Sequence, residues 1–344
     1  LQSMRDSFRL IDKGTFFGAL GLLLAVTLPL VIFPEQGAAW VALARSFVVE
    51  NFGFLYLALG FGAGVFMLFI AFSDIGRITL GSREEKPEFK TSSWAAMLFC
   101  AGIGASILYW GTIEWAYYFQ APPFQVEPYS PEAARWAAAY GIFHWGPLAW
   151  AIYLIPALPI AYFFYVRHRD VLKVSEALIP VLGEQRAHSN TGRIIDVLFV
   201  FGMLGGGATT LGLAAPLINE GAHELFGAPR GIVTQVIVLV VCTAIFGGSA
   251  YAGLKKGIQN LSILNMWLAL GLLAFIFVVG PTVFLANTGI DALGRVLSNI
   301  VHMATWIEPF GGFENFEDTH FPQDWTIFYW AWWLAFAPSV GLFI

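Results

Sequence analysis

Residues 258–287 read IQNLSILNMWLALGLLAFIFVVGPTVFLAN and contain no Asp, Glu, Lys or Arg. About 20 mostly apolar residues are enough to cross the hydrocarbon core of a bilayer as a helix. Comparable apolar stretches occur at roughly 14–33, 52–73, 94–119, 136–166, 195–218, 232–252 and 325–344. Transmembrane strands are only about 10 residues long and alternate in polarity, so these runs predict helices. We therefore expect an all-α polytopic membrane protein with eight spans.

The composition of the 344-residue chain agrees with that class. The chain is 58% hydrophobic and only 12% charged, whereas soluble domains are about 25% charged. This balance argues against a disordered chain and an ordinary soluble enzyme. The net charge of −5 and the lack of a basic block beyond residues 167–169 predict that nucleic acid is not a partner. The two cysteines, Cys100 and Cys242, lie in apolar runs and indicate neither a disulfide framework nor a metal site.

The distribution of basic residues predicts the orientation in the membrane. Most Lys and Arg residues fall before the first span or in the even-numbered loops, and only Arg45, Arg135, Arg230 and Arg295 fall on the other side. Basic loops stay in the cytoplasm, so we expect a plasma (inner) membrane protein with a cytoplasmic N-terminus. The chain begins at Leu1 and ends inside an apolar stretch, which indicates a fragment of a longer protein. The outer loop 288–324 contains an amphipathic stretch at residues 291–306, which can lie along the membrane surface.

Two glycine-rich segments lie within predicted spans. They read CAGIGAS at residues 100–106 and GMLGGGATT at residues 202–210. Each glycine costs about 1 kcal/mol in a helix interior, and unwound backbone at membrane depth survives where it lines a cavity or an ion site. Close helix packing through small residues is the alternative. The hydroxyls of Thr209 and Thr210 could bind an ion or bond back to their own helix.

Aromatic side chains gather in spans 4 and 8. Span 4 carries Trp145, Trp150 and Tyr153 around a potential kink at Pro147, and span 8 carries six aromatic residues between Trp325 and Trp333. A quaternary ammonium has no N–H donor and is held by ring faces, each contributing about 0.5–2 kcal/mol. Bulky side chains facing lipid or the core are the alternative reading of these rings.

Charged and catalytic groups are scarce within the spans. Glu114 and His144 are the main intramembrane ionisable residues, and such groups are functional candidates, although Glu114 is close enough to the outer end of its span to reach water. The spans contain no paired aspartates and no metalloprotease or serine-nucleophile motif. We therefore expect that the protein is not an enzyme.

Three motifs carry a resemblance to a known family. They are FHW at residues 143–145 with Trp150 and Tyr153, GLKKGIQNLS at residues 253–262 leading to Asn265, and WTIFYWAWW at residues 325–333. With them the chain resembles the betaine/carnitine/choline transporter (BCCT) family over nearly its whole length.

The resemblance implies an inverted-repeat, LeuT-like core preceded by two extra helices and truncated after span 8, with about four helices missing. Residues 1–93 would hold the cytoplasmic N-terminus and the extra helices, and residues 94–288 the first five-helix repeat. Residues 289–324 would be the external loop with its amphipathic helix, and residues 325–344 the first helix of the second repeat.

The resemblance also implies the site residues. Members of the family hold substrate in an aromatic box, which maps onto Trp145, Trp150, Tyr153, Trp332 and Trp333. Tyr117 resembles a box tyrosine of the carnitine-type members, and Trp325 matches an outer site. Ser106 stands where choline-selective members carry Asp, which favours a zwitterionic substrate.

The implied function is secondary transport of a quaternary-ammonium zwitterion, such as glycine betaine or carnitine, as a compatible solute by cation-coupled uptake. The implied partners are the lipid bilayer and two further copies in a homotrimer, and no cofactor is implied. An exchanger, a transporter of dimethylsulfonium zwitterions, and a non-transporting membrane osmosensor are the alternatives.

The coupling ion stays open between Na⁺, a proton and pure exchange. A sodium ion would use backbone carbonyls near Cys100 and Ile103, because Met203 and Gly207 replace the span-5 hydroxyls of sodium-coupled members. Val340 and Asn265 stand where exchangers carry Met and, nearby, Arg, which favours coupling over exchange.

Overall fold

The computed structural model describes residues 12–82, 84, 86–102, 106–169, 172–310 and 320–344. Regular secondary structure in these ranges is helical, and they contain no strand, as the all-α prediction requires. The chain divides into two compact units. The first unit comprises residues 1–83, 151–206 and 327–342, and the second comprises residues 84–150, 207–326 and 343–344.

The first unit begins with two packed helices, α2 (Lys13–Ile32) and α3 (Pro34–Phe72). The Asp12 carboxylate caps α2 by accepting hydrogen bonds from the backbone N–H groups of residues 14 and 15, at 3.1 and 3.2 Å. Pro34 opens α3, where its missing N–H costs nothing. Helix α3 begins at Pro34, well before the predicted start of the second span at residue 52. Residues 34–51 are helical although they carry Glu35, Arg45 and Glu50, charges that lower hydrophobicity without breaking a helix.

Eight further elements lie wholly or partly in the first unit. They are the 3₁₀ turn η1 (Asp74–Arg77), α7 (Pro147–Ala161), the π-helical segment η2 (Tyr162–Val166), α8 (Val174–Ala177), α9 (Ile179–Leu182), α10 (Glu184–Ala187), α11 (Asn190–Phe226) and, completing the unit, α15 (Phe321–Phe343). Helix α11 runs without a break through its glycines and crosses α15 closely. A Cβ on Gly202 would lie 3.3 Å from the Ala335 carbonyl, and one on Gly206 would lie 3.0 Å from the Phe336 ring. The glycines of this segment therefore serve close packing.

In the second unit, the predicted third span is two helices, α4 (Thr91–Gly102) and α5 (Ser106–Gln120), whose axes are bent by 60°. Residues 103–105 between them, including Ile103, lie outside the described residues. The fourth span is also interrupted. Helix α6 (Pro131–Trp145) stops at Gly146, where a Cβ would lie 2.3 Å from the Ile142 carbonyl oxygen, and α7 starts at Pro147.

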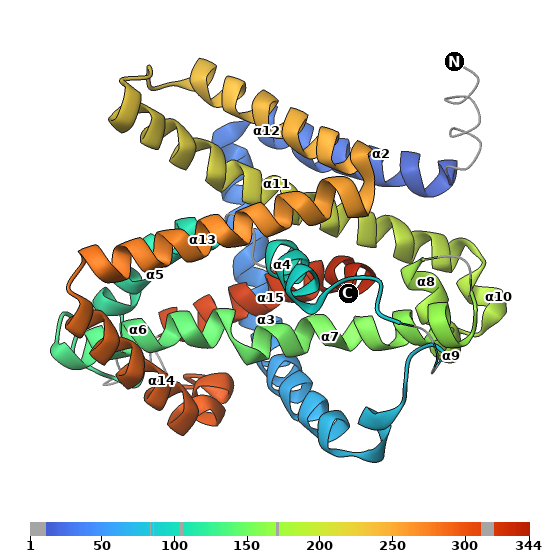
Figure 1. The fold of residues 1–344 in the computed structure, drawn as a ribbon, viewed down its shortest axis with the longest axis horizontal. Helices are drawn as coiled ribbons and strands as arrows, with labels where there is room; N and C mark the ends of the chain where they lie inside the picture. Colours follow the sequence, from blue (N-terminus) through green and yellow to red (C-terminus); the bar gives the residue numbers. More distant parts are fainter. Residues whose placement is uncertain (1–11, 83, 85, 103–105, 170–171, 311–319) are drawn as a thin grey trace. The chain divides into compact units, whose positions relative to one another are not determined.

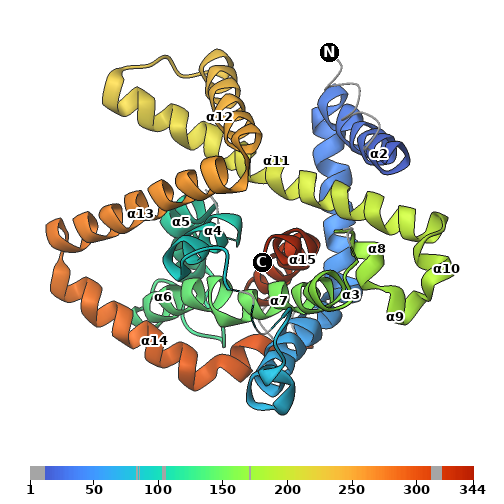
Figure 2. The ribbon, with the colours of Figure 1, turned by 45° about the vertical axis from the view of Figure 1, so that its right-hand side comes forward.

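The second unit also contains α12 (Ile232–Gly253), the π-helical segment η3 (Leu254–Ile258), α13 (Gln259–Val279) and α14 (Thr282–Thr305). The chain bends between α12 and α13 (Figure 2), where Gly253 has a φ of +82°. Helix α13 ends before Gly280 and Pro281, so the predicted span 258–287 was too long, and its last residues open the amphipathic α14. Helix α14 packs along α6 (Figure 1), where Arg295 pairs with both oxygens of Glu132 at 2.6 and 3.0 Å.

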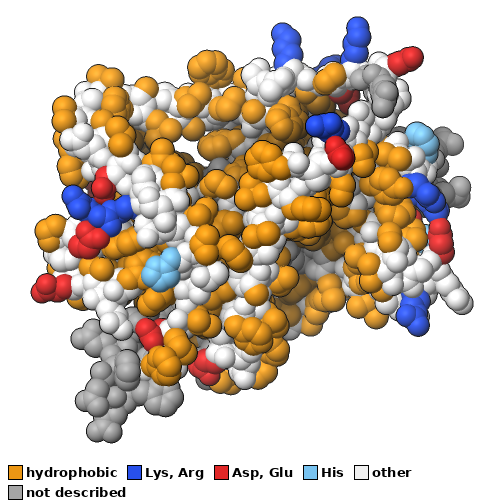
Figure 3. All heavy atoms as spheres, turned by 90° about the horizontal axis from the view of Figure 1, so that it is seen from below, with side chains coloured by type: hydrophobic (Ala, Val, Ile, Leu, Met, Phe, Trp, Pro, Cys, Tyr) orange, Lys and Arg blue, Asp and Glu red, His pale blue; other side chains and the backbone are white. Residues whose placement is uncertain are grey.

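Six helical segments of the described chain are long and apolar enough to cross a membrane, and the bent α4–α5 pair makes a seventh. One of the six, Ile232–Val279, contains the bend at Gly253 and covers two of the eight predicted spans. Hydrophobic side chains are spread widely over the face in Figure 3. Elsewhere in the described chain, as a separate measure, Phe69, Val240 and Phe275 are more than half exposed. This surface suits a multi-pass protein surrounded by lipid.

Candidate functional site

A cluster of aromatic rings, here called the Trp333 cluster, lies in the first unit. The Trp333 ring stacks on Trp332 at 5.4 Å and on Tyr329 at 5.6 Å between centroids. Tyr153 of α7 meets it edge to face at 5.7 Å, and Phe328 lies 5.7 Å from Trp332. The structure therefore brings together three predicted site residues: Tyr153, Trp332 and Trp333.

The helical register of α15 explains this arrangement. Residues 329 and 333 are one turn apart and share a face, and Trp332 lies beside them. Trp333 and Tyr153 are almost fully buried, at 3% and 2% exposure, whereas Trp332 is half-buried. Ring faces attract a cation electrostatically, and more strongly where water is excluded. The chemistry of the cluster is therefore suited to a cation without hydrogen-bond donors.

A second aromatic cluster, the Trp325 cluster, lies in the second unit. The Trp325 ring meets Tyr117 at 5.6 Å and Trp110 at 5.2 Å, both edge to face, and stacks on Phe321 at 5.5 Å. Tyr117 also contacts Phe321, at 6.3 Å. Two predicted residues, Tyr117 and Trp325, are thus neighbours, and the helices α5 and α15 supply them.

A buried polar network lies in the same unit. His144 Nδ1 is 2.8 Å from Glu114 Oε1, and His144 Nε2 is 3.0 Å from the Thr326 hydroxyl. The Trp145 indole donates to Glu114 Oε2 at 3.4 Å. The exposed fraction is 4% for Glu114, zero for His144 and 2% for Thr326. The expectation that Glu114 reaches water was therefore wrong, because its side chain is buried and bonded to His144 and Trp145 of α6.

The other predicted residues are placed in the second unit as follows. Trp150 is half-buried in the first turn of α7. Ser106 is 2% exposed and its hydroxyl lies 3.2 Å from that of Thr210 on α11. The Cys100 thiol donates to the Ser262 carbonyl at 3.7 Å.

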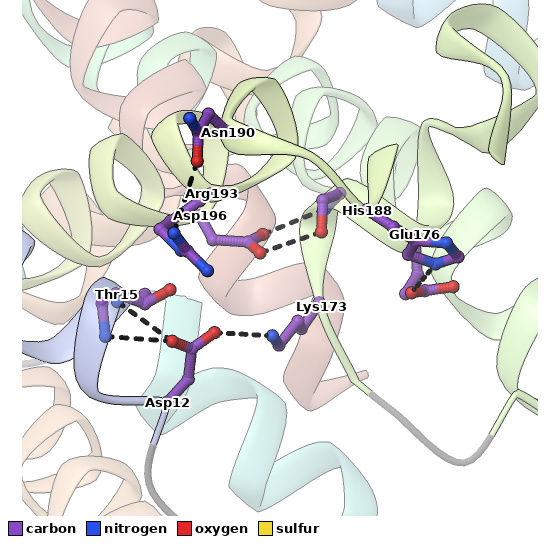
Figure 4. Close-up of polar contacts among 10 residues, drawn as sticks. Asp12, Thr15, Lys173, Glu176, His188, Asn190, Arg193 and Asp196 are labelled. Atoms are coloured by element: carbon purple, nitrogen blue, oxygen red, sulfur yellow. Dashed lines mark hydrogen bonds and ion pairs between the residues drawn. The ribbon is translucent and has the colours of Figure 1, made fainter. Parts of the chain in front are cut away.

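A third polar cluster, in the first unit, surrounds a small cavity of about 180 Å³ and contains none of the predicted site residues. Ser175 donates its backbone N–H and its hydroxyl to Asp196 at 3.0 and 2.8 Å, and Lys173 donates to Asp12 at 3.0 Å (Figure 4). The Lys173 hydrogen bond, aided by the Thr15 N–H, lowers the pKa of Asp12 to about 2. The bond between Asp12 and Lys173 fastens the start of α2 to the segment that precedes α8, and the bonds to Asp196 fasten α8 to α11, which is a structural role.

Sequence reasoning missed the partnership of Glu114 and His144 and the part played by Thr326. The signal was available, since two ionisable residues in consecutive spans are expected to pair when both face the protein interior. The ring partners Phe321 and Trp110 carried no such signal, because an aromatic residue in a span is as easily explained by lipid contact.

Comparison with known proteins gives consistent results. Residues 14–344 match the family model described as BCCT, betaine/carnitine/choline family transporter. The chain is 40% identical over 332 residues to the glycine betaine transporter OpuD of Bacillus subtilis (strain 168), covering 96% of this chain and 64% of the relative. It is 34% identical over 318 residues to a carnitine transporter of Acinetobacter baumannii, covering 92% of this chain and 56% of the relative.

A third relative is the high-affinity choline transport protein of Escherichia coli (strain K12), which is 34% identical over 334 residues, or 97% of this chain and 48% of that protein. The chain thus spans between about half and two-thirds of the length of these relatives. Since the family model covers nearly the whole chain, and the apolar helices and aromatic clusters agree with a membrane transporter, the chain belongs to the betaine/carnitine/choline transporter (BCCT) family.

Proposed function

We propose that the protein carries a small quaternary-ammonium zwitterion, such as glycine betaine or carnitine, across the plasma membrane by secondary transport. The relatives named as glycine betaine, carnitine and choline transporters support this substrate class. We further propose a cytoplasmic N-terminus, from the basic residues of the even-numbered loops, and a homotrimeric assembly, from the family resemblance.

The Trp333 cluster is the observation that carries the proposal. Trp332, Trp333 and Tyr153 contact one another in a largely buried setting, and we propose that their rings bind the cation. A trimethylammonium group offers no N–H and cannot satisfy a buried carboxylate by hydrogen bonding, so ring faces are its natural ligands. In this proposal each ring that faces the cation contributes about 0.5–2 kcal/mol to binding.

The remaining contacts are proposed from the family resemblance. Trp145 and Trp150 are further ring ligands, Tyr117 is a carnitine-type contact, and Trp325 belongs to an outer site. Ser106 brings no charge to the neighbourhood of the cation, which favours a zwitterion because a carboxylate there would repel the substrate's own carboxylate.

The coupling ion is the least constrained part of the proposal. We propose a single sodium ion bound by backbone carbonyls around Cys100 and Ile103, because Met203 and Gly207 supply no hydroxyl on α11. A proton is the alternative, and exchange is disfavoured by Val340 and Asn265. One sodium site predicts a Hill coefficient for sodium near one, and Met203→Thr with Gly207→Thr should raise it.

The test is uptake by the full chain in proteoliposomes. Labelled glycine betaine, carnitine and choline would be offered with and without an inward sodium gradient and, separately, a proton gradient. We expect accumulation of at least one zwitterion that depends on one of the gradients. Binding of a zwitterion without accumulation under any gradient would instead support an osmosensor, and the absence of both binding and uptake would refute the proposal.

A further inference from the structure

An apolar groove of about 510 Å³ lies in the first unit, between α3 and α15. Its lining includes Phe52, Leu55, Tyr56 and Leu59 of α3 and Ala331 and Ala335 of α15. Apart from the phenol of Tyr56, the lining side chains are hydrocarbon. The volume falls in the range of about 300–1,000 Å³ that is typical of small-molecule sites. None of the lining residues belongs to the Trp333 cluster, so the proposed function leaves this groove unused.

Close contacts beside the groove hold its two walls together. Gly53 and Gly60 are buried on α3. A Cβ on Gly53 would lie 2.6 Å from Cδ1 of Ile327, and one on Gly60 would lie 2.4 Å from Nε1 of Trp330. The two helices therefore meet at both glycines, while the larger α3 residues at 52, 55, 56 and 59, which share one helix face, form the adjacent wall. The groove is thus a fixed feature of a packed helix pair.

The position of the groove along α3 indicates that it faces lipid. Residues 51–72 contain no Asp, Glu, Lys or Arg, and about 20 such residues cross the hydrocarbon core. The groove occupies the first two turns of this stretch, and its residues Phe52 and Leu59 are 43% and 55% exposed. Side chains at a groove gain dispersion contacts from whatever fills it. At this depth in a membrane the filling material is an acyl chain.

Arg45 lies on the same face of α3, beyond the end of the groove. It precedes Phe52 by seven residues, which is two helical turns and about 10 Å along the axis. Its side chain is exposed, and within the part of the chain that the structure describes it makes no hydrogen bond or ion pair. The next acid along the helix, Glu50, is turned about 140° away and bonds to the Ser46 hydroxyl at 2.6 Å. A guanidinium in this position can pair with a phosphate.

The apolar groove and the cation above it match the two parts of a phospholipid. We propose that they form one binding site for an anionic phospholipid, with one acyl chain between α3 and α15 and the lipid phosphate on Arg45. The charge of Arg45 favours an anionic headgroup over a zwitterionic one. Since Ala331 and Ala335 flank Trp332 and Trp333 in sequence, the bound chain supports the helix that carries the Trp333 cluster. The site binds lipid whether or not the protein transports a zwitterion.

The test is photo-crosslinking of the full chain in phosphatidylcholine vesicles. The probe is phosphatidylglycerol with a diazirine in the upper part of one acyl chain, present as the minor anionic lipid, and labelled residues are identified by mass spectrometry. We expect the groove residues of α3 and α15 to be labelled more strongly than Phe54, which is 57% exposed at the same depth but lies outside the groove. Phosphatidylcholine with the same diazirine should label the groove less.

Variants separate the phosphate contact from the groove. Arg45→Gln should lower groove labelling about fivefold, as expected for one basic residue at a membrane surface, and Arg45→Lys should restore most of it. Arg77→Gln changes another exposed arginine of the first unit, 86% exposed, and should leave groove labelling unchanged. Ala335→Phe narrows the groove and should lower the labelling, whereas Leu68→Phe, at an exposed position of α3 outside the groove, should not.

Three results would each overturn the proposal. Equal labelling of Phe54 and the groove would identify ordinary boundary lipid. Unchanged labelling in Arg45→Gln, a substitution at an exposed site that the fold tolerates, would remove the phosphate contact. Crosslinks from the groove to a second copy of the chain in place of lipid would show that the groove is a protein interface. Labelling requires no substrate, so a failure of zwitterion uptake would leave this result unaffected.

Discussion

Replacing Gly60 by alanine tests the packing that supports the Trp333 cluster. Gly60 lies inside α3, where a Cβ would be 2.4 Å from Nε1 and 2.6 Å from Cδ1 of Trp330, a ring with no exposed surface. Real Cβ contacts essentially never fall below 3.0 Å, so the indole must move. Trp330 precedes Trp332 and Trp333 on the same helix, and its displacement will disturb their stacking.

The magnitude follows from two opposing terms. Alanine is favoured over glycine by about 1 kcal/mol in a helix interior, whereas overpacking a core costs about 1–3 kcal/mol. Because the contact is with a rigid buried ring, we take the upper part of that range and expect Gly60→Ala to destabilise the fold by about 1–2 kcal/mol. Gly62→Ala, two residues along, meets no atom within 4 Å and should be neutral or stabilising by up to about 1 kcal/mol.

The assay is thermal unfolding of the detergent-solubilised full chain, followed with a thiol-reactive dye that labels the free cysteines Cys100 and Cys242 on unfolding. Unfolding of such proteins is often irreversible, so all variants must be scanned at one rate. We expect Gly60→Ala to unfold several degrees below Gly62→Ala, and Trp330→Phe to reduce that difference when combined with Gly60→Ala. Equal unfolding temperatures for the two alanine variants would refute the reasoning.

Three other predictions address the site and the polar cluster of the first unit. Trp333→Ala should weaken substrate binding by about 1–2 kcal/mol and Trp333→Phe by less, and equal affinity of wild type and the alanine variant in calorimetry would remove Trp333 from the site. Ser106→Asp should shift uptake from betaine or carnitine toward choline, and a variant that still carries the original substrate but no choline would show that Ser106 does not face it. Asp12, whose pKa is lowered to about 2, stabilises the fold at pH values above 3.8, the ordinary pKa of its carboxyl group. That contribution is lost as the pH falls through about 2. Lys173→Met removes the main cause, so the variant should be less stable than wild type at neutral pH and should lose less stability between pH 3.8 and about 2, and identical acid-unfolding profiles would contradict this assignment.

The sequence predicted the class of the protein and most of its helices, because apolar length is a one-dimensional signal. Helix boundaries were less predictable. The charges of residues 34–51 hid the first half of α3, and Pro281, read as part of a long span, instead separates α13 from α14. These errors have one origin: hydrophobicity reports the environment of a residue, whereas caps and prolines determine where a helix begins and ends.

Part of the site was predictable from the sequence, because helical spacing and motifs can be read along the chain. Tyr153, Trp332 and Trp333 follow from helical spacing and motif resemblance, and the structure brings them together. The hydrogen bonds of Glu114 depend on how α5, α6 and α15 pack, and that packing is a three-dimensional property which no local pattern encodes. The glycine segment of α11 could be read as a break or as a crossing until the neighbouring Ala335 and Phe336 of α15 were placed.

The length of α3 has a consequence for how the protein sits in its membrane. At about 1.5 Å per residue, its 39 residues form a rod about twice as long as the hydrocarbon core is thick. Part of this rod must emerge into the headgroup layer, yet its first half still exposes Trp40 and Leu43, at 51% and 71%. An indole in the headgroup layer anchors the helix at a fixed depth in the membrane. A thicker bilayer would reduce the tilt of the helix.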